Sequence, residues 1–296
     1  MRRAARTAML RATTGISRAL VGPCVAAARL PGAWRVPVLL YHQVAESGGR
    51  GGYPWRVSPG LFEAQMRWLA DAGFDVVSLA AILRPRQDPV GRRAVVLTFD
   101  DGFRGFLLHA YPVLERYGFP ATWFLATGSI GMPVFPWTRQ WLTGAEDPEE
   151  YRPVSWEEAR RVQGPLVALG SHSVTHPHLA RLGPAGVEWE VTASRCQIER
   201  ETGARVTAFA YPGGIGRYGD HSAATRGALM AAGYACALVS EIGRNGAGAD
   251  PFGLRRLGIG AEDSLESFQA KVLGAYDWVR AVQWAAQRLT PDPSRY

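Results

Sequence analysis

Short apolar runs alternate with amphipathic segments along the chain from residue 36 onward. The runs are rich in β-branched and aromatic side chains and predict strands near residues 36–42, 74–79, 94–99, 120–126, 165–173, 207–212, 234–239 and 254–259. Between them, helical spacing recurs, as in 58–73, where Ser58 precedes Pro59 and Phe62 shares a face with Met66. Repeated strand–helix alternation predicts an α/β protein with a parallel sheet or barrel.

Polar and ionisable side chains directly follow several of the predicted strands. His42 ends the first strand, Asp100 and Asp101 follow the third, His172 ends the fifth, and Tyr211-Pro212-Gly213 closes the sixth. In parallel α/β barrels the carboxyl ends of the strands meet at one face, which carries the chemistry. We therefore expect these groups to converge on one site.

Two histidines four residues apart, His172 and His176, are suited to binding a metal ion. On one helical turn, or on a tight strand-to-helix bend, this spacing brings two imidazoles to one point. One aspartate of the pair Asp100-Asp101 completes a His₂Asp site with an open position for water. The other aspartate can take a proton from that water, and the cation offsets the repulsion between the two carboxylates. The same donor set also occurs in non-haem iron oxygenases, usually in antiparallel β-barrels.

The excess of positive charge is confined to the N-terminus. The net charge is +7, and seven arginines precede the first acidic residue, Glu46, so the rest of the chain is balanced. This argues against a nucleic-acid-binding face on the fold. We divide the chain into a basic arm or targeting segment at 1–35 and a single domain at 36–296. A cleaved leader and a membrane-surface arm both remain open for 1–35, and the three sparse cysteines favour a cytoplasmic or membrane-associated protein over a secreted one.

Three motifs together resemble those of the NodB-homology polysaccharide deacetylases, carbohydrate esterase family 4, in the exopolysaccharide-associated subgroup. They are LTFDDGF, GSHSVTHPHL and FAYPGG, and similarity extends over most of the chain after residue 36. The resemblance implies a distorted (β/α) barrel of about seven strands. It also implies a divalent metal ion, usually zinc, and hydrolysis of an N-acetyl group on a sugar or polysaccharide.

The resemblance also assigns roles to individual residues. Asp100 matches the catalytic base of the family, and its metal ligands match Asp101, His172 and His176. Tyr211, with Pro212 and Gly213, falls in the third motif of the family, whose backbone N–H helps to hold the oxyanion. These three residues are therefore the expected substrate-binding positions.

Two features of the family pattern are missing from this chain. The arginine that usually opens the third motif and braces the catalytic aspartate is replaced by Ala210, and no histidine follows His221 to act as the late general acid. The first and last strands of a closed barrel are neighbours, so we expect His42 to act as that acid or to orient Asp100. These departures keep a second interpretation open, a catalytically silent carbohydrate-binding relative.

Overall fold

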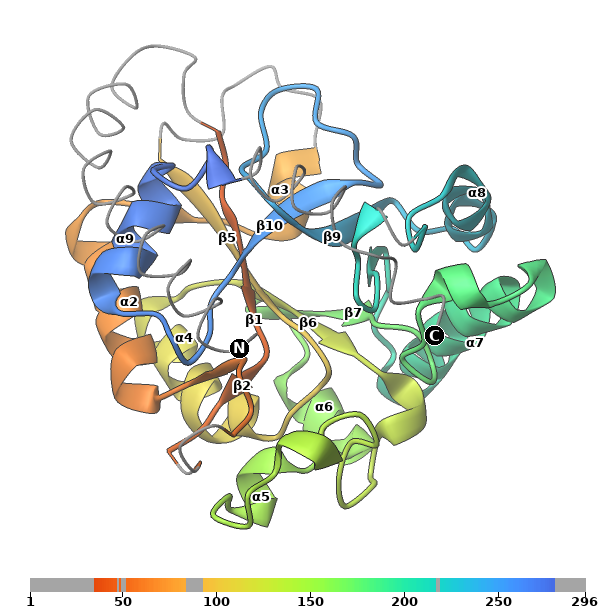
Figure 1. Cartoon of the computed structure of the whole chain (residues 1–296), viewed down its shortest axis with the longest axis horizontal. Helices are drawn as coiled ribbons and strands as arrows, with labels where there is room; N and C mark the ends of the chain where they lie inside the picture. The colour runs from red at the N-terminus through yellow and green to blue at the C-terminus, as the bar shows by residue number, and fades with distance from the viewer. Residues whose placement is uncertain (1–34, 47, 49–51, 84–92, 217–218, 280–296) are drawn as a thin grey trace, which may run out of the picture.

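Seven parallel strands close into a barrel in the computed structural model, which describes residues 35–46, 48, 52–83, 93–216 and 219–279 (Figure 1). The first barrel strand pairs with the last and also with the strand of residues 94–99, and these two pairings close the ring. The predicted parallel barrel is therefore confirmed. Its strands are β1 (Val38–Tyr41), β5 (Ala94–Phe99), β6 (Ala121–Leu125), β7 (Val167–Ser171), β8 (Ala208–Ala210), β9 (Cys236–Ile242) and β10 (Leu254–Gly258).

Among the described residues, three further short strands lie outside the closed ring. Strand β4 (Asp75–Val76) pairs with the start of β5, and β2 (Gln43–Val44) pairs with β3 (Arg56–Val57) in a two-stranded ribbon. The ribbon follows directly after β1, so it lies beside the carboxyl end of that strand.

The helices surround the barrel, with α2, α4 and α9 gathered on one side and α7 and α8 on the other (Figure 1). Serine side chains cap the first turns of several of them, as Ser58 does for α2. The helices are α2 (Pro59–Asp71), α3 (Leu79–Leu83), α4 (Tyr111–Tyr117), α5 (Pro148–Tyr151), α6 (Trp156–Val162), α7 (Pro184–Thr202), α8 (Ala223–Ala231) and α9 (Leu265–Leu273). A π-helical turn at Phe106–Ala110 precedes α4, where Pro112 has no amide hydrogen for a regular α-helical bond.

Successive residues of the barrel strands pack on opposite sides of the sheet. Val95 and Leu97 of β5 join a large cluster that includes the apolar faces of the surrounding helices, whereas Ala94 and Val96 join a second, smaller cluster. The second cluster draws on β1, β5, β6, β8, β9 and β10 and lacks the long helices, so it fills the barrel interior. Leu254 of β10 belongs to this second cluster. Side chains two residues apart in a strand point to the same side of the sheet, so Arg256 also points towards the barrel interior.

The segment between β6 and α6 forms a cover over the strand ends. Phe135 and Tyr151 from this segment pack with Ala45, Tyr53 and Phe103 in a separate apolar cluster, with the indole of Trp137 against it. Within the described part of the chain, no helix is long and apolar enough to cross a membrane. The basic arm predicted for 1–35 lies outside the described residues except for Arg35.

Candidate active site

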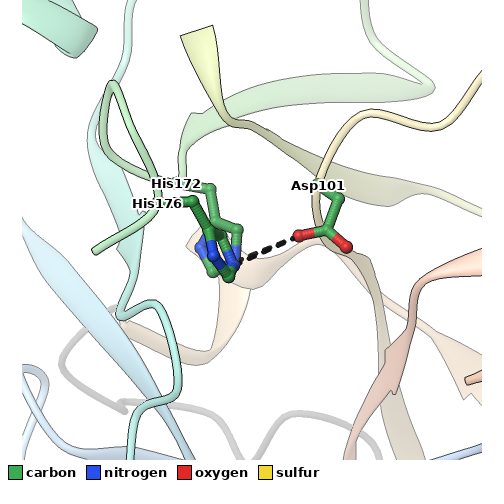
Figure 2. A group of neighbouring side chains, drawn as sticks. All are labelled: Asp101, His172 and His176. Carbon is green, nitrogen blue, oxygen red and sulfur yellow. Dashed lines mark ion pairs between the residues drawn. The ribbon is translucent and has the colours of Figure 1, made fainter. Parts of the chain in front are cut away.

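Asp101, His172 and His176 converge at the carboxyl ends of the barrel strands. The Oδ1 atom of Asp101 lies 3.5 Å from Nε2 of His172 and 3.4 Å from Nε2 of His176 (Figure 2). One ligand atom from each residue lies within 4.8 Å of the other two. We call these three residues the ligand cluster; the structure brings together the three side chains that the sequence predicts to bind a metal ion.

Asp101 and Asp100 reach the same site because the backbone leaves the strand conformation. Neighbouring side chains of a regular strand point to opposite faces. Asp101 instead has a φ of 74°, and Gly102 follows with a φ of 97°. This left-handed turn is unfavourable for a residue with a side chain, and it turns both carboxylates towards one point.

The two histidines of the ligand cluster lie on a bend and not on a helical turn. Ser173 and His176 have φ values of 63° and 59°, which a helix excludes. The Oε2 atom of Glu190, in α7, accepts hydrogen bonds from the amides of Val174 and Thr175 at 2.7 and 2.9 Å. Its Oε1 atom accepts a bond of 2.5 Å from the Thr175 hydroxyl. This buried carboxylate therefore holds the bend that aims both imidazoles.

The donor atoms of the ligand cluster fit a divalent cation. Nδ1 of His172 lies 2.7 Å from the carbonyl oxygen of Ala210, which can only accept, so Nδ1 carries the hydrogen and Nε2 presents a lone pair. Asp101 is 1% exposed, and among the described residues its Oδ1 atom has no hydrogen-bond donor. Burial, followed by the charge of Asp100, raises the pKa of Asp101. A cation between these atoms would offset both the burial of the Asp101 carboxylate and its repulsion by Asp100. Two imidazoles with one carboxylate are typical of zinc sites.

Asp100 is paired with an arginine that the sequence analysis missed. Nη1 of Arg256, in β10, donates a 2.7 Å hydrogen bond to Oδ1 of Asp100, and both side chains are buried. Nε of Arg256 donates to the carbonyl of Val239, which fixes the guanidinium. Burial would raise the pKa of Asp100, but Arg256, followed by His172, outweighs it and lowers the pKa to about 2. Arg256 therefore supplies the bracing cation that is absent at position 210.

The second oxygen of Asp100 faces the ligand cluster. Its Oδ2 atom lies 3.8 Å from Nε2 of His172. Because Oδ1 is held by Arg256, Oδ2 is the atom of this carboxylate that is placed to accept a proton beside the cluster.

His42 lies beside these groups, at the end of β1. Its ring is stacked 5.4 Å from that of Trp55 and lies 6.4 Å from that of Tyr53, whose hydroxyl donates to Oδ2 of Asp101 at 3.2 Å. Burial lowers the pKa of His42 to about 4, although the charge of Asp100 opposes the shift. Its Nδ1 atom has no hydrogen-bond partner among the described residues.

The third motif departs from the expectation for substrate binding. The Tyr211 side chain is fully buried with its hydroxyl bonded to the carbonyl of Phe252, and Pro212 is buried beside it. The backbone N–H of Tyr211 donates to the carbonyl of Leu238 at 3.1 Å, so it is already engaged and is not free to hold an oxyanion. Of the three expected residues, only Gly213 is exposed, and it lies against the ring of His178.

Comparison with known proteins places this geometry in a family. The model of the polysaccharide deacetylase family matches residues 87–237, just over half of the chain. The protein YxkH of Bacillus subtilis (strain 168), whose name assigns it provisionally to the polysaccharide deacetylases, is 26% identical over 240 residues, which are 80% of this chain and 76% of YxkH. The poly-β-1,6-N-acetyl-D-glucosamine N-deacetylase of Escherichia coli (strain K12) is 32% identical over 112 residues, 37% of this chain and 16% of that protein.

A solved structure agrees with the fold. The deacetylase PplD of Streptococcus pyogenes, solved in complex with acetate, superposes with a TM-score of 0.66 at 22% identity. The superposition covers 81% of this chain and 98% of PplD. The barrel described here is thus shared over nearly the whole of that protein.

Proposed function

The chain belongs to the polysaccharide deacetylase family, hydrolases of carbon–nitrogen bonds, and on this premise we propose that it removes N-acetyl groups from a glycan with a divalent ion bound at the ligand cluster. One observation carries the proposal. A buried aspartate that is held ionised by Arg256 turns its free oxygen towards a His₂Asp cluster with an unpartnered carboxylate oxygen.

The ligand cluster and Asp100 divide the chemistry between them. A divalent ion, for which zinc is the best match to the donor set, would polarise the acetamide carbonyl and lower the pKa of a water molecule. Asp100 accepts a proton from the attacking water at Oδ2 while Arg256 keeps Oδ1 in place. Tyr53 holds the second oxygen of Asp101 and so fixes the direction of the first.

The leaving amine needs a proton, and two residues can deliver it. His42 lies at the site, but its pKa is lowered to about 4, so it is neutral at pH 7 and must first take up the proton that Asp100 has accepted from water. Asp100 carries a proton once it has acted as the base, and can pass it on. Both routes remain in the proposal, and the His42 variant described below separates them.

The relatives suggest which glycans to test first. Two named poly-β-1,6-N-acetyl-D-glucosamine N-deacetylases, from Escherichia coli and Staphylococcus aureus, match about a third of this chain at 32% and 31% identity. We therefore propose polymers of N-acetylglucosamine as the substrate class and β-1,6-linked oligomers as the first substrates.

Acetate release tests the proposal. The full chain is stripped of metal, reconstituted with zinc, and incubated with β-1,6-linked and β-1,4-linked N-acetylglucosamine oligomers. We expect acetate release that is lost on chelation and restored by the metal. Activity that persists in thoroughly chelated protein would contradict the role of the ion. Bound metal without acetate from any oligomer would favour the catalytically silent relative.

A further inference from the structure

A partly exposed tryptophan lies against the candidate active site. Trp55, in the turn directly before β3, is 39% exposed. One face of its indole is stacked on the ring of His42, with the ring centroids 5.4 Å apart and the planes within 24°. The exposed surface of Trp55 is therefore continuous with the site and is not an isolated apolar position.

Two glycines lie against the indole. Gly258 ends β10, and Gly260 follows it; a Cβ atom at these positions would come within 3.4 and 3.5 Å of the six-membered ring of Trp55, which is ordinary van der Waals contact. At Gly260 a Cβ would also approach the carbonyl oxygen of Pro54 to 2.6 Å, which would displace the backbone before Trp55. The indole thus lies between the His42 ring and the backbone of Gly258 and Gly260, while part of its surface stays open.

Trp55 is the outer end of a continuous series of aromatic contacts. From His42 the contacts pass through Tyr53, Phe103, Phe135 and Trp137 to His176, with neighbouring ring centroids 4.1–6.4 Å apart. The series runs from the candidate acid to a member of the ligand cluster. The rings of Tyr53, Phe103 and Phe135 are buried and support the site from behind, whereas Trp55 presents an exposed face beside it.

We propose that Trp55 forms a carbohydrate subsite that stacks the sugar residue adjoining the one whose acetyl group is removed. A pyranose ring presents an apolar face of C–H groups and a polar rim, and an exposed indole stacked on one side complements that face. This inference rests on the proposed deacetylation of a glycan. It adds that the site recognises at least two consecutive sugar residues.

A second exposed tryptophan provides a matched control. Trp189, in α7, is 52% exposed and makes no aromatic contact among the described residues. Its removal tests the loss of an exposed indole without touching the series of rings. Trp55→Phe is the conservative variant, because it keeps an aromatic face at the subsite.

The kinetic test compares kcat/KM for N-acetylglucosamine oligomers of increasing length, from the monosaccharide upward. We expect Trp55→Ala to lower the ratio of kcat/KM for long oligomers to kcat/KM for the monosaccharide by about tenfold, with Trp55→Phe restoring most of it. The ratio cancels any disturbance of His42, because His42 acts on the reacting residue at every length. A Trp55→Ala ratio equal to that of the wild type and of Trp189→Ala overturns the subsite.

A binding test separates failure of the subsite from failure of the proposed function. Affinity for a long oligomer is measured by calorimetry in the Asp100→Asn protein, with and without Trp55→Ala. We expect about tenfold weaker binding when the indole is removed, and no change when Trp189→Ala is added instead. Equal affinity in all three proteins overturns the subsite even if acetate is released. If removal of the indole weakens binding but the wild-type protein releases no acetate, the subsite is supported and the proposed deacetylation is contradicted.

Discussion

The two neighbouring aspartates of the site lie in opposite surroundings. Oδ1 of Asp101 faces two imidazole nitrogens and has no hydrogen-bond donor among the described residues, whereas Oδ1 of Asp100 is paired with the buried guanidinium of Arg256. One carboxylate is left open for a cation from outside, and the other already has a permanent cation from the chain. Two adjacent, identical residues thus acquire separate tasks from partners that lie far from them in sequence.

The two sides of the site also differ in how the backbone supports them. The ligand cluster stands on left-handed residues, Asp101 and His176, and Glu190 holds its bend. His42 and Arg256 stand on, or directly after, barrel strands that the closure of the ring brings together. The ligand cluster depends on a locally strained bend, whereas His42 and Arg256 depend on the closure of the barrel. Substitutions that loosen the bend should therefore act on zinc affinity, and substitutions of His42 or Arg256 should act on turnover.

The largest effect of the three side-chain changes that follow is expected for His42→Gln. If His42 protonates the leaving amine, kcat for N-acetylated oligomers should fall by roughly two to four orders of magnitude. Hydrolysis of 4-nitrophenyl acetate should fall much less, because its leaving group needs no proton. An equal loss on both substrates would indicate a positioning role for His42, and a small loss on both would leave Asp100 as base and acid.

A smaller loss of turnover is expected for Arg256→Met. Without the guanidinium Asp100 is no longer held, and a small misplacement of a catalytic group costs about 100-fold in rate. The unpaired buried carboxylate should also lower the free energy of unfolding by about 3–5 kcal/mol. Adding Asp100→Asn should recover part of that stability, measured by denaturant unfolding. The neighbouring Arg255→Met is the control, and wild-type turnover in Arg256→Met would contradict the bracing role.

The smallest effect is expected for Glu190→Ala, on the other side of the site. Removing the carboxylate leaves two amides of the histidine bend unpaired, and zinc affinity should fall by about 10–100-fold in competition with a chromophoric chelator. Glu190→Gln should retain most of the affinity, because its oxygen can accept both amides and its amide can donate to Thr175. The exposed Glu188→Ala is the control. Unchanged affinity in Glu190→Ala would show that the bend holds itself.

The sequence predicts what lies close together along the chain. The barrel strands follow from the apolar runs, and the ligand cluster follows from two short motifs at strand ends, so both could be anticipated. The sequence left a helical turn and a strand-to-helix bend open for the two histidines, and the structure shows the bend. It depends on Glu190, which bonds to an amide 16 residues earlier, and the spacing of the histidines does not reveal this contact.

Arg256 could not be assigned in the same way. It is separated by 156 residues from Asp100, and it follows Arg255 in a strand where neighbouring residues point to opposite faces. Only the closure of the barrel decides which arginine lies inside. For Tyr211 the sequence identified the motif but not the state of its backbone N–H. That N–H donates to the carbonyl of Leu238, a contact that depends on the pairing of β8 with β9.

The separation of tasks between the two aspartates is tested most directly by measuring bound zinc and acetate release in Asp100→Asn and Asp101→Asn side by side. Asp100→Asn should keep its zinc and lose turnover, because it removes a proton acceptor and no ligand. Asp101→Asn should lose zinc affinity, and with it turnover. Loss of the metal in Asp100→Asn together with its retention in Asp101→Asn would contradict the account, since it would exchange the tasks of the two residues.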